Sequence, residues 1–241
     1  MYLANIVSAC SCALALSRKN FFREVLAADF RLDNGEKRSI TSFAAVCATT
    51  NFASSVLVLL DITCLDYVLG DAAILADYRV ASMIPTACMF VPSSLIIFFY
   101  PQLVMKFSES RELGKRELKK LAGIFGAINS AVGILLIMVA PLAIWLIFGR
   151  KYLNVIPVFI VLSINYMVHS IRMLLGNAIA AIKHVKVNLA ISIISGIINV
   201  ALDLMLIPVL GSVGAAVATL SVSLIVLGME LIFFARYFKK A

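Results

Sequence analysis

The chain has 241 residues, of which 62% are hydrophobic and only 14% are charged. A soluble domain carries roughly 45–50% apolar and about 25% charged residues, so this composition excludes an ordinary soluble fold. The formal net charge of +8 is distributed in short blocks between apolar stretches. That arrangement is typical of membrane topology, and it argues against nucleic-acid binding, because no basic domain stands apart from the apolar stretches.

The first apolar stretch, residues 1–17, ends at Arg18 and Lys19. A signal peptide carries its positive charge before the apolar run, whereas here the charge follows it. We therefore interpret residues 1–17 as the tail of a preceding transmembrane helix, cut from a longer protein. Residues 18–39 are then expected to form a basic cytoplasmic connector.

Six longer apolar stretches follow, each long enough for the helix of about 20 residues that crosses roughly 30 Å of hydrocarbon. The predicted spans are residues 40–60, 80–105, 121–148, 155–182, 187–208 and 212–234. The sequence therefore predicts an all-α, polytopic transmembrane helix bundle, with a six-helix lobe over residues 40–241. Pro85, Pro92 and Pro101 predict bends in the second of these spans. The small residues of GSVGAAVAT (211–219) predict close packing of the last helix.

The connections between the spans alternate in their content of basic residues. Seventeen of the Lys and Arg residues fall in residues 18–39, 106–120, 183–186 and the C-terminal segment, and three fall in residues 61–79, 150–151 and 208–212. Because the basic side of a membrane protein faces the cytoplasm, we expect a multi-pass protein with a cytoplasmic C-terminus. Residues 106–120 are expected to lie on membrane lipid as an amphipathic helix at the inner leaflet.

One basic residue, Arg172, falls inside a predicted span. It lies ten residues before Ile182, or about 15 Å from the cytoplasmic end of its helix. Ionisable residues within spans are costly and are therefore candidates for function. Asn165, His169 and Gly176 share its helix face, at spacings of one turn. The next span carries a second polar stripe, formed by Asn188, Ser192, Ser195, Asn199 and Asp203.

The two polar stripes predict a shared hydrated cavity. Its candidate substrate-binding or cavity-lining residues are Arg172, His169, Asn165, Asn199 and Asp203. The alternative is that small and polar residues merely hold the helices together, as is common in membrane bundles. By helical rise Asp203 belongs nearer the outer end, so no direct ion pair with Arg172 is expected. An unpaired guanidinium suits an anionic ligand. Glu230 is expected to reach the membrane interface.

Catalysis finds little support in the sequence. The spans contain no carboxylate pair at helical spacing, no Gly-rich phosphate loop and no metal-ligand cluster, so we expect no enzyme, cofactor or metal site. Cys10 and Cys12 have no matching His or Cys cluster and are interpreted as apolar packing residues. The aspartates from Asp61 to Asp77 are spaced by 5, 5 and 6 residues, which does not form one helical face.

Several stretches resemble a known family when taken in order. They are LGDAAILADYRVASMIP (69–85), FVPSSL (90–95), YPQLV (100–104), LIFGRKY (146–152) and LIPVLGSVGAAVAT (206–219). Together with the basic C-terminus, their order and spacing resemble bacterial polysaccharide (O-antigen type) flippases of the MATE-like exporter superfamily. The resemblance implies the second six-helix lobe of a two-lobe transporter, preceded by the tail of its sixth helix.

The resemblance also implies a function. Such a protein translocates a polyprenyl-pyrophosphate-linked oligosaccharide across the bacterial inner membrane by alternating access, for the synthesis of surface polysaccharide such as lipopolysaccharide O-antigen. It implies a cationic central cavity, which Arg172 would line, and no ATP hydrolysis. Because a cavity between two lobes needs both, the expected partner is the missing N-terminal lobe or a second copy of this chain.

Other functions stay open on the sequence alone. A cation-coupled drug exporter or a peptidoglycan-precursor flippase would belong to the same superfamily. A drug exporter would be expected to bury carboxylates for cationic substrates, whereas the deepest predicted charge is Arg172. A membrane-embedded glycan polymerase or ligase would need a large outer loop, and the longest outer connection is residues 61–79. A non-transport assembly subunit would not depend on Arg172.

Overall fold

A computed structural model describes residues 35, 41, 45, 48–49 and 60–239. The chain divides into two compact units, residues 1–44 and 45–241. The predicted helix tail at 1–17, nearly all of the connector at 18–39 and nearly all of the span at 40–60 lie outside the described residues.

Residues 60–239 are helical almost throughout, and the described residues contain no strand. After helical residues 60–69 come α4 (Ala72–Ala87), α5 (Phe90–Glu109), α6 (Arg111–Phe148), the short 3-10 helix η1 (Arg150–Val155), α7 (Ile156–Ala181), α8 (Val185–Leu210) and α9 (Ser212–Lys239). Five helical segments are long and apolar enough to cross a membrane: 72–109, 111–148, 150–181, 185–210 and 212–239. They correspond to the last five predicted spans, which confirms an all-α, multi-pass helix bundle.

The first of these segments is interrupted near its middle. α4 ends at Ala87 and α5 begins at Phe90, with Cys88 and Met89 forming a turn between them. Pro85 and Pro92 flank this turn, and a proline supplies no backbone N–H for the helical hydrogen-bond ladder. The predicted bend in this span is therefore confirmed, because a two-residue turn interrupts the helix there.

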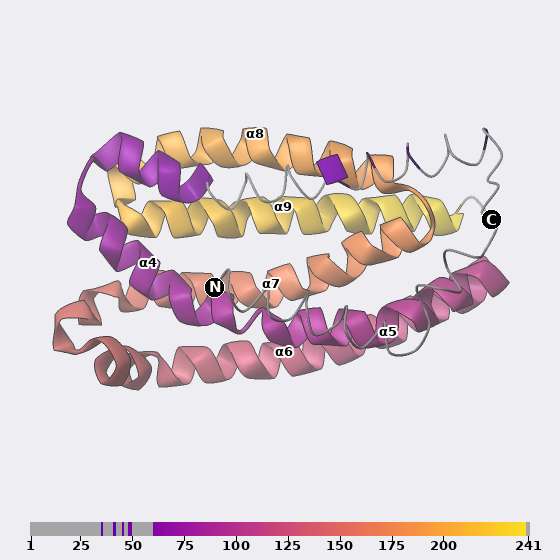
Figure 1. The fold of residues 1–241 in the computed structure, drawn as a ribbon, viewed down its shortest axis with the longest axis horizontal. Coiled ribbons are helices and arrows are strands. Elements are labelled where there is room, and N and C mark those ends of the chain that lie inside the picture. Colours follow the sequence, from indigo (N-terminus) through magenta and orange to yellow (C-terminus); the bar gives the residue numbers. More distant parts are fainter. Residues whose placement is uncertain (1–34, 36–40, 42–44, 46–47, 50–59, 240–241) are drawn as a thin grey trace, which may run out of the picture. The chain divides into compact units, whose positions relative to one another are not determined.

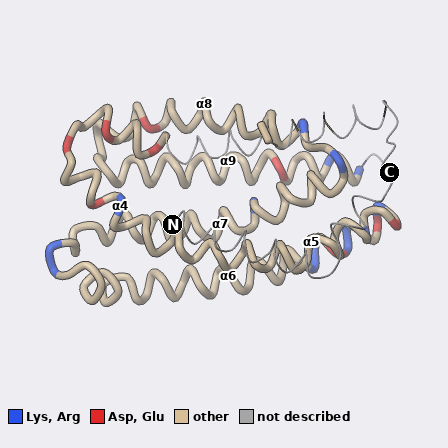
Figure 2. The backbone as a smooth tube through the Cα atoms, viewed as in Figure 1, with Lys and Arg blue, Asp and Glu red and all other residues tan. Residues whose placement is uncertain are grey.

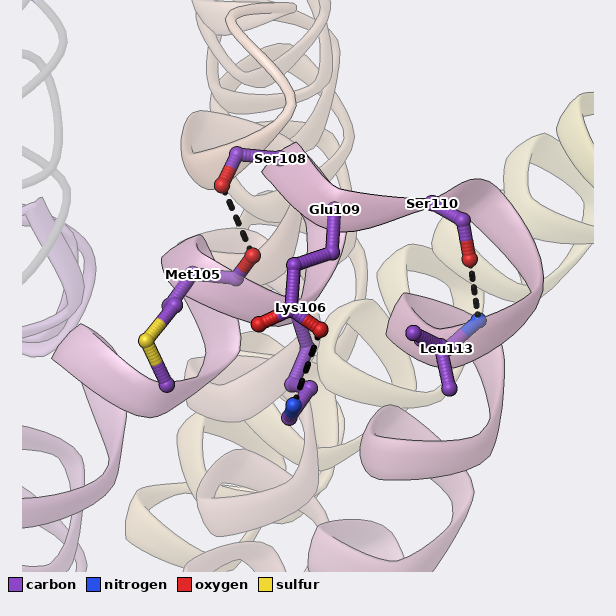
Figure 3. Close-up of polar contacts among 6 residues, drawn as sticks. All are labelled: Met105, Lys106, Ser108, Glu109, Ser110 and Leu113. Atoms are coloured by element: carbon purple, nitrogen blue, oxygen red, sulfur yellow. Dashed lines mark hydrogen bonds and ion pairs between the residues drawn. The ribbon is translucent and has the colours of Figure 1, made fainter.

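The prediction for residues 106–120 is wrong. Instead of a separate surface helix, the segment completes α5 and opens α6, whose 38 residues correspond to about 57 Å of helix. Ser110 caps α6 by accepting a hydrogen bond from the Leu113 N–H at 3.2 Å, and Lys106 pairs with Glu109 at 2.9 Å (Figure 3). Since hydrocarbon is only about 30 Å thick, this basic hairpin extends beyond the span.

The predicted outer connection at 61–79 is likewise mostly helical. Residues 60–69 form one helical segment, and α4 starts at Ala72, which leaves only Gly70 and Asp71 between them. Gly70 has φ +58°, a conformation that side chains with a Cβ rarely adopt. Asp71 caps α4 by accepting the Ala73 N–H at 2.8 Å. Asp61 therefore lies in a helical segment and not in a loop.

α7 is the central helix of the unit. It contacts α4, α5, α6, α8 and α9, while α8 packs mainly on α9 (Figure 1). The buried apolar side chains form two clusters, one around Phe159 and Ile207 and the other around Phe125 and Ile179. Both clusters include residues of α7, so this helix carries polar side chains between two apolar layers.

The outer faces of the bundle are strongly apolar. Large exposed hydrophobic side chains on α6 and α8 include Leu135, Met138, Leu146, Ile197, Met205 and Val209. A water-soluble monomer rarely exposes apolar surface on this scale, whereas lipid chains solvate it. The helix faces therefore fit a membrane environment.

Charged residues separate toward the two ends of the bundle (Figure 2). The α5–α6 turn, the α7–α8 turn and the end of α9 carry most of the described Lys and Arg residues, with Glu109, Glu112 and Glu117 among them. The opposite end carries Asp61, Asp66, Asp71 and Asp77 together with Arg150 and Lys151. The helices thus bring together the connections that the alternation of charge had grouped. We call these the basic end and the acidic end.

Candidate functional site: buried charges along α7, α8 and α9

The α7 stripe lies inside the bundle, as its helical spacing predicted. Arg172 Nη1 donates a hydrogen bond to Ser223 Oγ of α9 at 2.8 Å. One turn further along, the Gly176 carbonyl accepts from Asn188 Nδ2 of α8 at 2.7 Å. Asn165 Oδ1 is buried without a hydrogen-bond partner, and His169 is half-buried beside Arg172. α7 thus presents one polar face to α8 and α9, the two helices that follow it in the chain.

Arg172 has no carboxylate in ion-pair contact among the described residues. Its Nε is buried and has no partner among the described residues, and its Nη1 donates to the neutral hydroxyl of Ser223. The charged group that acts electrostatically on Arg172 is Glu230 of α9. A half-buried guanidinium that is held by a hydroxyl keeps hydrogen-bond donors available for an anion.

Glu230, which the sequence led us to expect at the membrane interface, is buried among the helices of the bundle. It is only 5% exposed, and its Oε2 is buried without a partner. α9 continues to Lys239, beyond Phe234, where the apolar span was expected to end. Glu230 therefore lies nine residues inside the helix end, or about 14 Å along the axis.

The α8 stripe is also buried. Ser195, Asn199 and Asp203 are 4%, 5% and 0% exposed. The stripe meets α7 through the hydrogen bond of Asn188 at its basic-end side, whereas Asp203 lies toward the acidic end. No ion pair joins Asp203 to Arg172 in the described part of the chain, as the sequence predicted. The two stripes touch, but they place their charges at different depths.

Asp203 faces a second carboxylate that the sequence reasoning had assigned to a loop. Asp61 is 9% exposed and accepts a hydrogen bond from Thr219 Oγ1 of α9 at 2.7 Å. The carboxyl groups of Asp61 and Asp203 lie close enough to influence each other electrostatically, and the Asn199 amide lies near Asp61. Neither oxygen of Asp203 receives a hydrogen bond from a described donor. Helical residues 60–69, α8 and α9 therefore build one oxygen-rich group of four side chains.

This group has a definite chemistry. Two adjacent buried carboxylates cannot both remain ionised without compensation, so they either share a proton or hold a cation. Carboxylate, amide and hydroxyl oxygens are the ligands that hard cations prefer. A signal for the α8 part was present in the sequence, because Asn199 and Asp203 lie one turn apart. The contributions of Asp61 and Thr219 depend on tertiary packing, as does that of Ser223 beside Arg172.

A site built from Cys and His is not found among residues 60–239. No group of three or more His, Cys, Asp or Glu residues there could hold a metal ion. Cys64 and Cys88 are free thiols, and Cys10, Cys12 and Cys47 lie outside the described residues. The charged side chains enclosed in the bundle among residues 60–239 are those of Arg172, Glu230, Asp61 and Asp203.

Comparison with known proteins assigns no function to this chain, so a functional assignment rests on these residues. No protein-family profile, no curated protein and no solved structure matches this chain.

Proposed function

We propose that this chain is one lobe of a flippase for a polyprenyl-pyrophosphate-linked oligosaccharide in the bacterial inner membrane, where it serves the synthesis of surface polysaccharide. The observation that carries the proposal is Arg172, a guanidinium inside an apolar bundle with no carboxylate of the described residues in ion-pair contact. Its candidate neighbours are His169 and Asn165 on α7, and the cavity is completed by a first lobe or by a second copy.

The physical argument is the cost of the charge. A cation within a membrane-spanning helix is expensive, so such residues face a protein interior or a hydrated path and mark a function. Arg172 donates one hydrogen bond to Ser223, and its Nε has no partner among the described residues. Packing alone would be served by an apolar side chain. A pyrophosphate group, which accepts several hydrogen bonds from a planar guanidinium, would use this donor fully.

The Asp61–Asp203 group supports coupling of transport to a cation or a proton. Its carboxylates come from two different helical segments, and Thr219 of a third donates to Asp61. A monovalent cation bound between them, or a proton shared by them, would draw these segments together. Release would loosen them, so occupancy of the group would bias the bundle between two arrangements.

A cation-coupled drug exporter or a peptidoglycan-precursor flippase is the second candidate. The observation in favour of the drug exporter is that Asp203 and Glu230 are buried more completely than Arg172. Buried carboxylates suit cationic substrates, and the sequence alone had indicated that Arg172 was the deepest charge. The sign of the substrate charge therefore separates the flippases from the drug exporter.

Complementation tests the flippase proposal. The 241-residue chain is co-expressed with a six-helix N-terminal lobe in a strain that lacks its polysaccharide flippase, and surface polymer is measured. We expect Arg172→Ala to abolish polymer, whereas Arg150→Ala, which removes an exposed arginine at the acidic end, leaves it intact. Normal polymer with Arg172→Ala would remove this residue from the mechanism, and polymer-independent resistance to cationic drugs would favour the exporter.

Cation binding is tested on the purified chain in nanodiscs. Sodium is expected to raise the unfolding temperature relative to choline, and Asp203→Asn is expected to abolish most of this rise, because the amide neutralises half of the carboxylate pair. Asp66→Asn is the matched control, since Asp66 lies on the same helical segment as Asp61 but is exposed. An equal sodium response in all three proteins would exclude a sodium site at this group. The same comparison across pH then tests a shared proton.

A further inference from the structure

Glu230 of α9 lies against α7 at Gly176, close to Arg172. Gly176 lies four residues after Arg172, so the two share one face of α7. Glu230 Oε1 of α9 lies 3.6 Å from the position that a Cβ on Gly176 would occupy. The carboxylate of Glu230 therefore rests against α7 one helical turn from Arg172, on the side of the basic end.

The two groups form an incomplete charge pair. Glu230 is 5% exposed with Oε2 unpartnered, and Arg172 keeps an unpartnered Nε. Each charge acts on the other, yet no ion pair between them is found in the described part of the chain. Instead, the guanidinium reaches to Ser223, which precedes Glu230 by seven residues on the same face of α9. Arg172 thus lies between a neutral hydroxyl and a buried carboxylate.

We propose that Glu230 is the internal counter-ion of Arg172, and that an anionic group of the ligand takes its place when it reaches the guanidinium. The second part rests on the proposed function, because it needs an anionic ligand. In the ligand-free protein Glu230 compensates the buried positive charge, which would otherwise stand alone among apolar helices. The ligand then competes with Glu230 for the same guanidinium, and Glu230 lowers the affinity of the site for anions.

A purely structural role makes a different prediction. If Glu230 only fills the space over Gly176, the nearly isosteric Glu230→Gln retains the packing and leaves anion affinity unchanged. If Glu230 is the counter-ion, the same change removes the competing charge without removing volume. Glu230→Gln therefore separates the two roles.

The binding test uses the full chain in nanodiscs and inorganic pyrophosphate as the probe, with affinity measured by calorimetry. Glu230→Gln is expected to bind pyrophosphate at least fivefold more tightly than the wild-type chain, and Arg172→Gln is expected to lose binding. Glu112→Gln is the control, since Glu112 is an exposed glutamate at the basic end. Unchanged or weaker binding by Glu230→Gln would overturn displacement of Glu230 by the ligand.

A test without ligand decides the counter-ion role by itself. Unfolding temperatures are compared for Arg172→Gln, Glu230→Gln and the double variant. We expect the double variant to lose clearly less than the sum of the two single losses, because each single change leaves one buried charge uncompensated. Strict additivity would overturn the counter-ion role. If the cycle shows coupling while the wild-type chain fails to bind pyrophosphate, the anionic substrate fails and the counter-ion role stands.

Discussion

At the scale of single residues, buried polar groups specify how α6 and α7 face each other. Tyr166 Oη donates to Asn129 Oδ1 at 2.7 Å, and Asn129 Nδ2 donates back to the Phe125 carbonyl at 2.9 Å. Tyr166 is fully buried and Asn129 is 1% exposed. Because both side chains are buried, the Tyr166 hydroxyl and the Asn129 amide oxygen satisfy each other's hydrogen bond.

Tyr166→Phe is expected to lower the free energy of unfolding by about 1 kcal/mol, because it leaves the Asn129 oxygen buried without a donor. Adding Asn129→Leu should cost less than Asn129→Leu costs in the wild-type chain, since the orphaned amide oxygen is then gone. Equilibrium unfolding in mixed detergent measures both values. Additive losses would contradict a direct bond between the two side chains.

Residue-level prediction succeeded where periodicity was enough. The inward facing of Arg172 was predicted from helical spacing, and its interhelical bond to Ser223 agrees with that facing. The burial of Glu230 was not predicted, because the sequence of one apolar span does not show which of its side chains neighbouring helices cover. Asp61 was misplaced because the helical structure of residues 60–69, just after the apolar stretch, was read as a loop.

At the scale of elements, the close packing of the α8–α9 hairpin depends on small residues. Gly211 alone joins the two helices and adopts φ +59°, a conformation available mainly to glycine. A Cβ on Gly214 would lie 2.7 Å from the carbonyl carbon of Leu206. Gly214, Ala215, Ala216 and Ala218 are all buried, which confirms the predicted close packing of GSVGAAVAT.

Gly214→Ala is expected to destabilise the protein by about 1–3 kcal/mol, because the contacted atoms belong to the backbone of α8 and can move only with that helix. Gly228→Ala is the control within α9, since nothing lies within 4 Å of its Cβ position. That change should be neutral or slightly stabilising, given the higher helix propensity of alanine. Thermal unfolding compares the two. Equal effects would contradict the backbone contact at Gly214.

At the scale of the whole bundle, charge separation connects sequence with topology. The α5–α6 hairpin joins the end of α9 at the basic end, where the Arg111 guanidinium carbon lies 4.1 Å from the centroid of the Tyr237 ring and Lys115 faces Phe238. Basic side chains that anchor on aromatic rings in this way gain cation–π stabilisation. The segment expected to lie on lipid is therefore packed, at least in part, on the protein itself.

The orientation of the bundle is tested by labelling single cysteines in a background from which the five native cysteines are removed. Arg150→Cys at the acidic end is expected to react with a membrane-impermeant maleimide in intact cells. Glu112→Cys at the basic end is expected to react only after permeabilisation, because the basic side faces the cytoplasm. Labelling of both sites in intact cells, or the reverse pattern, would contradict this orientation.

The sequence by itself determined the membrane class, the last five spans, the grouping of basic and acidic ends and the presence of a charge inside α7. All of these follow from composition and from the periodic spacing of side chains along a single helix. Each segment shows both features independently of its neighbours. Tertiary structure alone decided that Asp61 meets Asp203, that Ser223 holds Arg172 and that Glu230 rests on Gly176. These pairings join residues of different helices, and their depths depend on where each helix ends and on how closely the small residues of α7 and α9 let the backbones approach.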